Sequence, residues 1–96
     1  MRVRLSRQAA EFVASLPPEP RRRLRAALKD LQREKGDIVP LTEPLQGYYR
    51  CRVGAYRIVL RYEPGQAVYV PLVERRPVVY QLLAELLKAE LGQTGD

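Results

Sequence analysis

The sequence predicts a single α+β domain in which a helical hairpin packs on an antiparallel sheet. Apolar residues recur every three or four positions over residues 9–31 and then alternate with polar residues over residues 48–62. A chain of 96 residues has room for one domain only. An apolar share of 46% and a charged share of 29% are typical of a folded chain and exclude a disordered or fibrous one.

The first predicted elements are a short strand and two helices. Arg2–Leu5 alternates polar and apolar side chains, which indicates a brief strand. Ser6 is a good N-cap for a helix that must stop at the Pro17-Pro18 pair. A second helix begins near Pro20 and runs down to Gly36. Its outer face carries a basic ridge made of Arg22, Arg25, Lys29 and Arg33.

The second half of the chain predicts a sheet and a last helix. Asp37–Gly47 shows no sustained period and is predicted to be a loop. Pro71 lacks a backbone donor, so we expect a β-bulge there or an unpaired N–H side. A helix over Val78–Leu91 completes the domain, and the tail 92–96 is expected to be disordered. Short turns make an antiparallel meander of the three strands Tyr48–Val53, Tyr56–Tyr62 and Ala67–Val73.

The composition excludes several kinds of site. The chain has no histidine and one cysteine, Cys51, which rules out histidine triads, histidine metal sites and an internal disulfide. We therefore expect neither a metal nor a cofactor, and we expect Cys51 to be a small core residue. No apolar run approaches the length of about 18 residues that spans a membrane, and the N-terminus lacks the apolar stretch of a signal peptide, which predicts a cytoplasmic protein.

The charge balance favours an anionic partner. Seventeen basic residues, fourteen of them arginine, stand against eleven acidic ones and give a net charge of +6. This balance suits nucleic acid, an acidic protein or an anionic membrane, and simple solubility is the plainer explanation. The preference for arginine points to phosphate, because a planar guanidinium can contact two phosphate oxygens.

Strand parity predicts where four of the arginines lie. Alternate side chains of a strand share a face, so the apolar residues of the first two meander strands point to the core. The opposite face is predicted to be exposed and to carry Arg50, Arg52, Arg57 and Arg61. Like charges gathered in this way repel one another unless an anion, or the carboxylates Glu63 and Glu74, neutralise them. The cluster therefore suggests a phosphate-binding surface, the alternative being arginines that only solvate a sheet face.

One run of residues resembles a known family. The strands in Gly47-Tyr-Tyr-Arg-Cys-Arg-Val-Gly-Ala-Tyr-Arg-Ile-Val-Leu60 are followed by Val68-Tyr69-Val70, then by Arg75-Arg76 and Tyr80. This pattern resembles the RelE/ParE superfamily, the toxins of bacterial type II toxin-antitoxin systems, and the resemblance covers residues 3–80. It implies the compact RelE-like α+β fold that the periodicity also predicts.

The resemblance implies a metal-independent endoribonuclease that cleaves messenger RNA on the ribosome by attack of the RNA's own 2′-hydroxyl. In this interpretation Arg57, Arg76 and Tyr80 are catalytic, with the arginines holding the phosphorane charge and Tyr80 stacking on a base or moving a proton. Further substrate contacts come from Arg50, Arg52, Arg61 and Arg75. Many relatives carry histidine at the position of Arg75, and the proton acceptor is left open among Tyr80, Glu74 and a group on the ribosome.

Alternatives to a nuclease remain open at this stage. ParE-like members of the superfamily inhibit DNA gyrase on the same scaffold, and an attenuated member would only bind its antitoxin. A general basic nucleic-acid binder is a third possibility. The resemblance also implies a toxin-antitoxin hetero-oligomer in which an acidic antitoxin binds across the helical hairpin and the C-terminal helix, with no membrane partner.

Overall fold

The computed structural model describes residues 1–75, 80–85 and 87–88. Its elements are, in chain order, β1 (Arg2–Leu5), α1 (Arg7–Ser15), α2 (Pro18–Leu31), β2 (Ile38–Pro40), β3 (Tyr49–Val53), β4 (Tyr56–Glu63) and β5 (Ala67–Arg75). A C-terminal helical segment follows at residues 80–85 and 87–88. The α+β class and the succession of strand, helical hairpin, meander and helix are confirmed. In this described part, no helix has the length and apolar character to cross a membrane.

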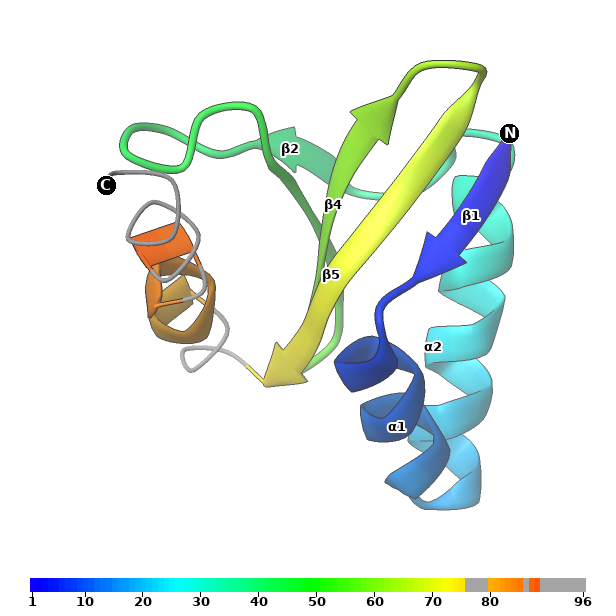
Figure 1. Cartoon of the computed structure of the whole chain (residues 1–96). Coiled ribbons are helices and arrows are strands. Elements are labelled where there is room, and N and C mark those ends of the chain that lie inside the picture. The colour runs from blue at the N-terminus through cyan, green and yellow to red at the C-terminus, as the bar shows by residue number, and fades with distance from the viewer. Residues whose placement is uncertain (76–79, 86, 89–96) are drawn as a thin grey trace.

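The molecule has three layers, which Figure 1 shows. α1 and α2 lie on one side of the sheet, and the C-terminal helical segment lies on the other. The sheet has five strands in the order β1-β5-β4-β3-β2. β1 runs parallel to β5, with Leu5 opposite Val70, and the other neighbours are antiparallel. The N-terminal strand therefore closes one edge of the meander and makes β5 an interior strand.

α1 begins where its cap predicts. The Ser6 Oγ accepts a hydrogen bond from the Ala9 N–H at 3.0 Å, as an N-cap does, and the helix ends at Ser15 ahead of Pro17. The Ser6 hydroxyl also donates to the carbonyl of Pro71 at 2.7 Å. One side chain therefore caps the helix and joins it to β5.

α2 is shorter at its C-terminal end than the sequence predicts. It begins at Pro18, close to the predicted Pro20, because proline is well suited to the first turn of a helix. It ends at Leu31 and does not reach Gly36. Leu31 is the last buried residue of its stripe, and Glu34 has a φ of 54°, a left-handed conformation that no α-helix continues through.

The predicted loop contains a strand, so the prediction is wrong for residues 38–40. β2 pairs with β3 in antiparallel register, with Ile38 opposite Cys51. Two β-branched residues ahead of a proline are sufficient for a short edge strand, which tolerates proline. Alternation is recognised over four residues or more, so a three-residue strand escapes it.

The predicted β-bulge at Pro71 is confirmed. Val59 pairs with Leu72 and Arg61 pairs with Tyr69, so Leu60 alone faces two residues of β5. One of these two is Pro71, which has no N–H to give to the ladder. The bulge thus places the proline where the regular pairing of β5 with β4 is interrupted.

The main core lies between the helical hairpin and the sheet. The predicted inward parity of β3 and β4 is confirmed, since the Cys51, Ile58 and Leu60 side chains are fully or almost fully buried. Apolar stripes of both helices and inward residues of β5 complete this core: Ala9, Val13, Leu16, Leu24, Leu28, Leu31, Val68, Val70 and Val73. Burial of this set from water supplies the main driving force for the fold.

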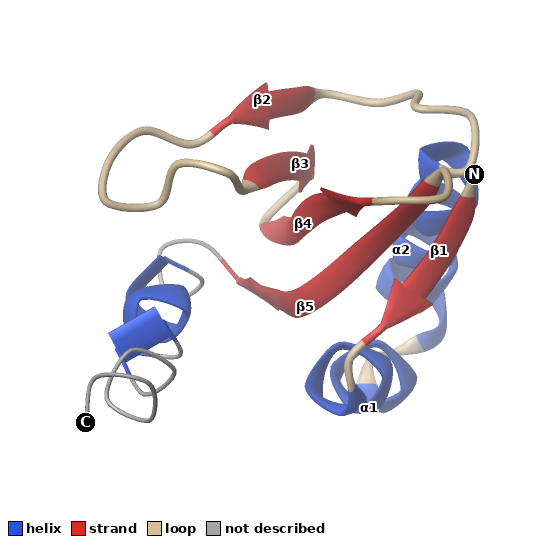
Figure 2. Cartoon of the chain, turned by 45° about the horizontal axis from the view of Figure 1, so that its top comes forward, coloured by secondary structure: helices blue, strands red, loops and turns tan. Residues whose placement is uncertain are grey.

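The opposite face of the sheet is covered at its centre, which corrects the prediction of an exposed face. Val59, Leu72 and Leu83 form a second buried cluster there. Half-buried side chains from the loop after β2 and from the C-terminal segment surround it, namely Leu41, Leu45, Tyr48, Tyr80, Leu82 and Leu87. Both segments lie on this side of the sheet in Figure 2. Strand parity places Val59 on this outward face, and leucines of the C-terminal helical segment cover it.

Two predictions concern residues outside the described part of the chain. The predicted helix over residues 78–91 is described only at 80–85 and 87–88, where it is helical. The expected disordered tail at 92–96 lies wholly outside the described residues.

Gln8 completes the pairing of β5 beyond the end of β1. β1 pairs with β5 only as far as Val70, which leaves the Val73 backbone without a strand on that side. The Gln8 side-chain amide takes the place of the missing strand: its Oε1 accepts from the Val73 N–H at 3.2 Å, and its Nε2 donates to the Val73 carbonyl at 3.1 Å. Two backbone groups of a fully buried residue are satisfied in this way.

We expect Gln8→Ala to lower the free energy of unfolding by about 2 kcal/mol, because it leaves one backbone donor and one acceptor unpaired at a buried strand. Urea denaturation followed by circular dichroism measures the change. Gln46→Ala, at an exposed glutamine in the loop after β2, is the matched control and should stay within about 0.5 kcal/mol of the wild type. Equal effects of the two substitutions would contradict the pairing role of Gln8.

Candidate nucleic-acid interface

The pairing of β3 with β4 brings three of the predicted site residues together. Arg52 lies opposite Arg57, and Arg50 lies opposite Val59 on the same face. Neighbouring residues of one strand point to opposite faces, so this face is the one that also carries the second buried cluster. The three arginines therefore border the apolar centre of the face that the C-terminal segment covers.

Arg57 is buried, although strand parity predicted it to be exposed. Its exposed fraction is 5%, and its Nη1 donates to the carbonyls of Gly54 and Tyr56, both at 2.9 Å. Gly54 has a φ of 58°, which glycine adopts without steric cost. In this turn conformation the Gly54 carbonyl accepts the hydrogen bond from the Arg57 guanidinium. The β3–β4 turn thus holds Arg57 in one orientation.

Glu74 stands beside Arg57 on the neighbouring strand. The two residues are directly opposite in the β4–β5 register, on the face of the arginines. Glu74 is half-buried, and its Oε2 lies 3.4 Å from the Gln8 amide nitrogen. Glu74 Oε1 accepts a hydrogen bond from the Arg75 N–H at 3.3 Å, so both carboxylate oxygens are engaged by groups other than the Arg57 guanidinium. Glu74 is still the carboxylate that neighbours Arg57 in the register, and a carboxylate can serve as a proton acceptor.

Asp37 was not among the predicted site residues, yet it contacts two of them. Its Oδ2 lies 3.4 Å from Arg50 Nη1 and 3.1 Å from Arg52 Nε. β2 begins at the next residue and pairs with β3, so the strand missed in the sequence is what brings this carboxylate to the arginines. The paired β-branched residues Ile38 and Val39 are the signal that would have revealed it.

Two other predicted arginines, Arg61 and Arg75, do not join this cluster. Arg61 lies at the other end of β4, where it contacts the Tyr48 hydroxyl at 3.3 Å. Arg75 points to the opposite face, since its guanidinium lies 5.5 Å from the centre of the Tyr56 ring, which belongs to the main core. Strand parity accounts for both positions, because Arg75 is one residue beyond Glu74 on β5.

Of the two other predicted catalytic residues, only Tyr80 is described. It is half-buried and packs against the second cluster beside the arginines. Arg76 lies outside the described residues.

Cys51 is a core residue, as the sequence predicts. Its side chain is 2% exposed, and burial raises the pKa of its thiol, which opposes formation of the reactive thiolate. No three histidine, cysteine or carboxylate side chains gather closely enough for a metal ion among the described residues.

The arrangement is suited to binding and stabilising phosphate. The cluster of Arg50, Arg52 and Arg57 carries three positive charges against the two carboxylates of Asp37 and Glu74. The ion pairs with Asp37 are partly solvated, since the carboxylate is 43% exposed, and such pairs exchange readily for another anion. An incoming phosphate would first meet the exposed guanidinium of Arg52 and the partly exposed one of Arg50, whereas Arg57 is buried with 5% of the residue exposed.

Comparison with solved structures identifies similar folds. The chain matches a chain of the toxin-antitoxin complex RelBE2 from Mycobacterium tuberculosis with a TM-score of 0.69 and 28% identity, over 78% of this chain and 96% of that one. It matches a chain of the RelE-RelB complex from Pyrococcus horikoshii with a TM-score of 0.60 and 26% identity, over 79% and 94% of the two chains.

A third similar structure is the YoeB/ParE toxin from Agrobacterium tumefaciens, with a TM-score of 0.67 and 19% identity, over 79% of this chain and 99% of that one. At this identity the likeness concerns the fold alone. No protein-family model matches the sequence, and no curated protein sequence matches it either.

We expect Arg57→Ala to lower the free energy of unfolding by about 1 to 3 kcal/mol, because it removes a buried donor and leaves two carbonyls of the β3–β4 turn without a partner. Arg52→Ala removes the same charge from a side chain that is 56% exposed, and it should change stability by no more than about 0.5 kcal/mol. Urea denaturation of both variants tests this difference. An Arg57 variant as stable as the Arg52 variant would show that the turn does not depend on the guanidinium.

Proposed function

Because this chain belongs to the RelE/ParE superfamily of toxins, we propose that it is the toxin of a type II toxin-antitoxin module and that it cleaves messenger RNA on the ribosome without a metal ion. The observation that carries the proposal is the arginine cluster of β3 and β4 beside Tyr80 on one sheet face. Toxin-antitoxin complexes of RelE and RelB among the similar structures support it.

The chemistry would use the RNA's own 2′-hydroxyl as the nucleophile. A bond forms between the 2′-oxygen and phosphorus, and the bond from phosphorus to the 5′-oxygen breaks. The products are a 2′,3′-cyclic phosphate and a 5′-hydroxyl end. The 2′-hydroxyl proton passes to a base, and the 5′-oxygen receives a proton from an acid. The step therefore consumes no water and balances without a metal ion.

Each residue of the cluster has a role in this proposal. Arg57 would stabilise the phosphorane charge, since a guanidinium already held in place needs no reorganisation during the reaction. Arg76 would be its partner, and Arg50 and Arg52 would hold the flanking phosphates. Glu74 is the candidate base that the chain itself supplies beside the cluster, because it is opposite Arg57 in the register of β4 and β5.

The remaining chemistry falls to Tyr80 and to groups outside the chain. Tyr80 would stack on a base or donate the leaving-group proton. Of the three acceptors that the sequence left open, the other two are Tyr80 and a group on the ribosome, and they would be favoured if removal of the Glu74 carboxylate did not slow cleavage.

The proposed partner is an acidic antitoxin. The basic ridge is exposed along its length, with Arg22, Arg25 and Lys29 on α2 and Arg33 just beyond its end. In a chain with a net charge of +6, this ridge offers an acidic segment a surface away from the arginine cluster. An antitoxin that also covered the C-terminal segment would hide Tyr80.

A second candidate function is a ParE-like toxin that inhibits DNA gyrase without cutting RNA. The burial of Arg57 favours it, because a guanidinium engaged by two backbone carbonyls has a structural role in the free chain. In that case the arginine cluster would be dispensable for toxicity.

Cleavage on programmed ribosomes separates the two candidates. We expect the wild-type chain to produce messenger RNA fragments with 5′-hydroxyl ends. Arg57→Lys should cut about a hundredfold more slowly, because lysine keeps the positive charge but lacks the planar guanidinium that donates two parallel hydrogen bonds. Primer extension measures the fragments. Arg7→Ala, which removes an arginine from α1 with 92% of its side chain exposed, should cut as the wild type does. Toxicity without fragments, unchanged in Arg57→Lys, would support gyrase as the target.

We expect Asp37→Asn to strengthen RNA binding about three- to tenfold, because the carboxylate that competes with phosphate for Arg50 and Arg52 is gone. Affinity for an uncleavable 2′-O-methyl RNA measures the effect. Asp30→Asn makes the same charge change at an exposed site of α2 that has no ion pair among the described residues, and it serves as the control. Weaker binding by Asp37→Asn would mean that Asp37 orients the two arginines for substrate.

A further inference from the structure

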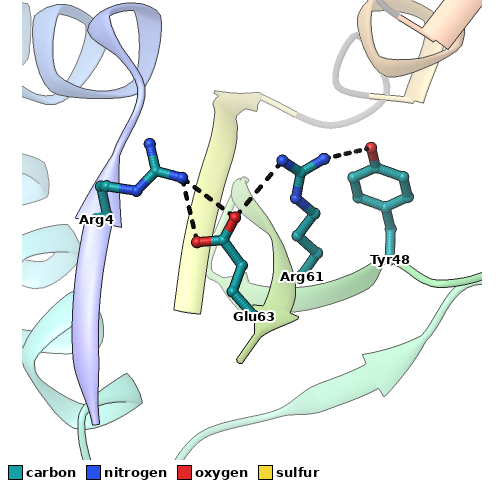
Figure 3. Close-up of polar contacts among 4 residues, drawn as sticks. All are labelled: Arg4, Tyr48, Arg61 and Glu63. Carbon is teal, nitrogen blue, oxygen red and sulfur yellow. Dashed lines mark hydrogen bonds and ion pairs between the residues drawn. The ribbon is translucent and has the colours of Figure 1, made fainter. Parts of the chain in front are cut away.

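A second group of basic and aromatic side chains lies on the same sheet face, toward the β4–β5 turn. Register brings it together from three strands: Arg4 of β1 is opposite Tyr69 of β5, and Tyr69 is opposite Arg61 of β4. Figure 3 shows Arg4 and Arg61 on either side of Glu63, with Tyr48 beyond Arg61. We call Arg4, Arg61, Glu63 and Tyr69 the edge cluster.

The contacts in the edge cluster hold two guanidinium groups close together. Arg4 Cζ lies 4.2 Å from the centre of the Tyr69 ring, and Arg61 Cζ lies 4.9 Å from the same point. Arg4 Nη2 is 3.1 Å from both Glu63 oxygens, and Arg61 Nη2 is 3.6 Å from Glu63 Oε2. One carboxylate and one ring therefore serve two arginines.

Basic side chains outnumber acidic ones at this edge of the sheet. Arg2 and Arg4 of β1 lie near the single carboxylate of Glu63. A groove of about 420 Å³ adjoins the cluster and is lined by Arg2, Val3, Arg4, Glu63, Pro64 and Ala67. Two of its three charged residues are arginines that point the same way from β1, since they are two residues apart.

The ion pairs within the cluster are open to exchange. The Arg4 side chain is 62% exposed and the Arg61 side chain 37%. Exposed pairs contribute only about 0 to 1 kcal/mol each, so a phosphate that contacts both guanidinium groups can replace the carboxylate at little cost. Among the described residues, Arg4 uses only its Nη2 in a hydrogen bond, and its other donors face no protein partner.

The position of the edge cluster favours RNA over an acidic protein. It shares its face with Arg57, from which Arg61 is separated by four residues of β4, a spacing of about 13 Å. Buried Val59 and the leucines that cover it lie between the two basic groups, so their exposed members, Arg52 and Arg4, flank a covered centre. A single strand that passed around this cover would place phosphates at both, whereas the exposed ridge of α2 lies on the helical side of the sheet.

We propose that Arg2, Arg4 and Arg61 form a second phosphate-binding site, which holds the RNA backbone away from the cleavage site and which Glu63 partly blocks. The proposal rests on the proposed function for the identity of the ligand as RNA. It adds residues of β1 to a surface that otherwise consists of β3, β4, β5 and Tyr80.

Binding to an uncleavable 2′-O-methyl RNA, measured at several salt concentrations, tests the proposal. We expect Arg4→Ala to weaken binding about three- to tenfold and to reduce the salt slope by about 0.7, the value for one phosphate contact on a single strand. Glu63→Gln is expected to strengthen binding by a similar factor. A gain in RNA affinity cannot arise from a folding defect. Glu63→Gln therefore tests the proposal even if Arg4→Ala is unstable.

The ion pair between Arg7 and Glu11 on α1 supplies matched controls, since it has the same charges at a distance of 2.8 Å on the helical side of the sheet. Arg7→Ala and Glu11→Gln should shift RNA affinity less than twofold. The proposal fails if Arg4→Ala equals Arg7→Ala, if Glu63→Gln binds no better than Glu11→Gln, or if the edge-cluster variants change affinity for polyglutamate and leave that for RNA unchanged.

The same set of variants distinguishes this proposal from the proposed function. A wild-type chain that binds uncleavable RNA through Arg4 but produces no fragments on ribosomes would support the second site and contradict the nuclease. Fragments from the wild type, with equal RNA affinity for Arg4→Ala and Arg7→Ala, would support the nuclease and contradict the second site. An isolated ribosomal RNA hairpin added as a competitor identifies which RNA occupies the site.

Discussion

Strand β5 is the element on which the rest of the described structure depends, because both of its edges and both of its faces are occupied. β4 pairs along one edge and β1 along the other, and Ser6 and Gln8 continue the second edge after β1 ends. Its side chains enter the main core and the second cluster alternately. These contacts join residues 65 apart in the chain, so the first eight residues set the surroundings of the candidate site.

The bulge in β5 decides which side chains share the functional face. Tyr69 and Leu72 are three residues apart, a spacing that puts side chains of a regular strand on opposite faces. The extra residue opposite Leu60 shifts the alternation, so that Tyr69 meets Arg61 and Leu72 meets Val59 on one face. The bulge at Pro71, a residue that would weaken a regular interior strand, thus brings Tyr69 of the edge cluster to the side of Arg61.

Four arginines of this face contact acidic neighbours from adjacent strands. Asp37 contacts the pair on β3, and Glu63 contacts Arg4 and Arg61, whereas Arg57 is held by carbonyls of the β3–β4 turn. The carboxylates relieve the repulsion that like charges on a sheet would otherwise cause. Under the proposed function they are also the groups that a phosphate would displace, so the affinity for RNA would be a balance between two sets of weak, partly solvated ion pairs.

Periodicity, prolines and cap residues in the sequence were sufficient for the α+β class, the helical hairpin, the meander, the bulge at Pro71 and the inward parity of Cys51 and Ile58. These are local properties of the chain, and local spacing reports them directly. The sequence did not reveal the partner of β1, the short β2 that brings Asp37 to its arginines, or the cover over Val59. Nor did it reveal that Arg57 would turn inward to the β3–β4 turn. Those features depend on contacts between residues far apart in the chain, and alternation along one strand assigns a face without saying what will lie against it.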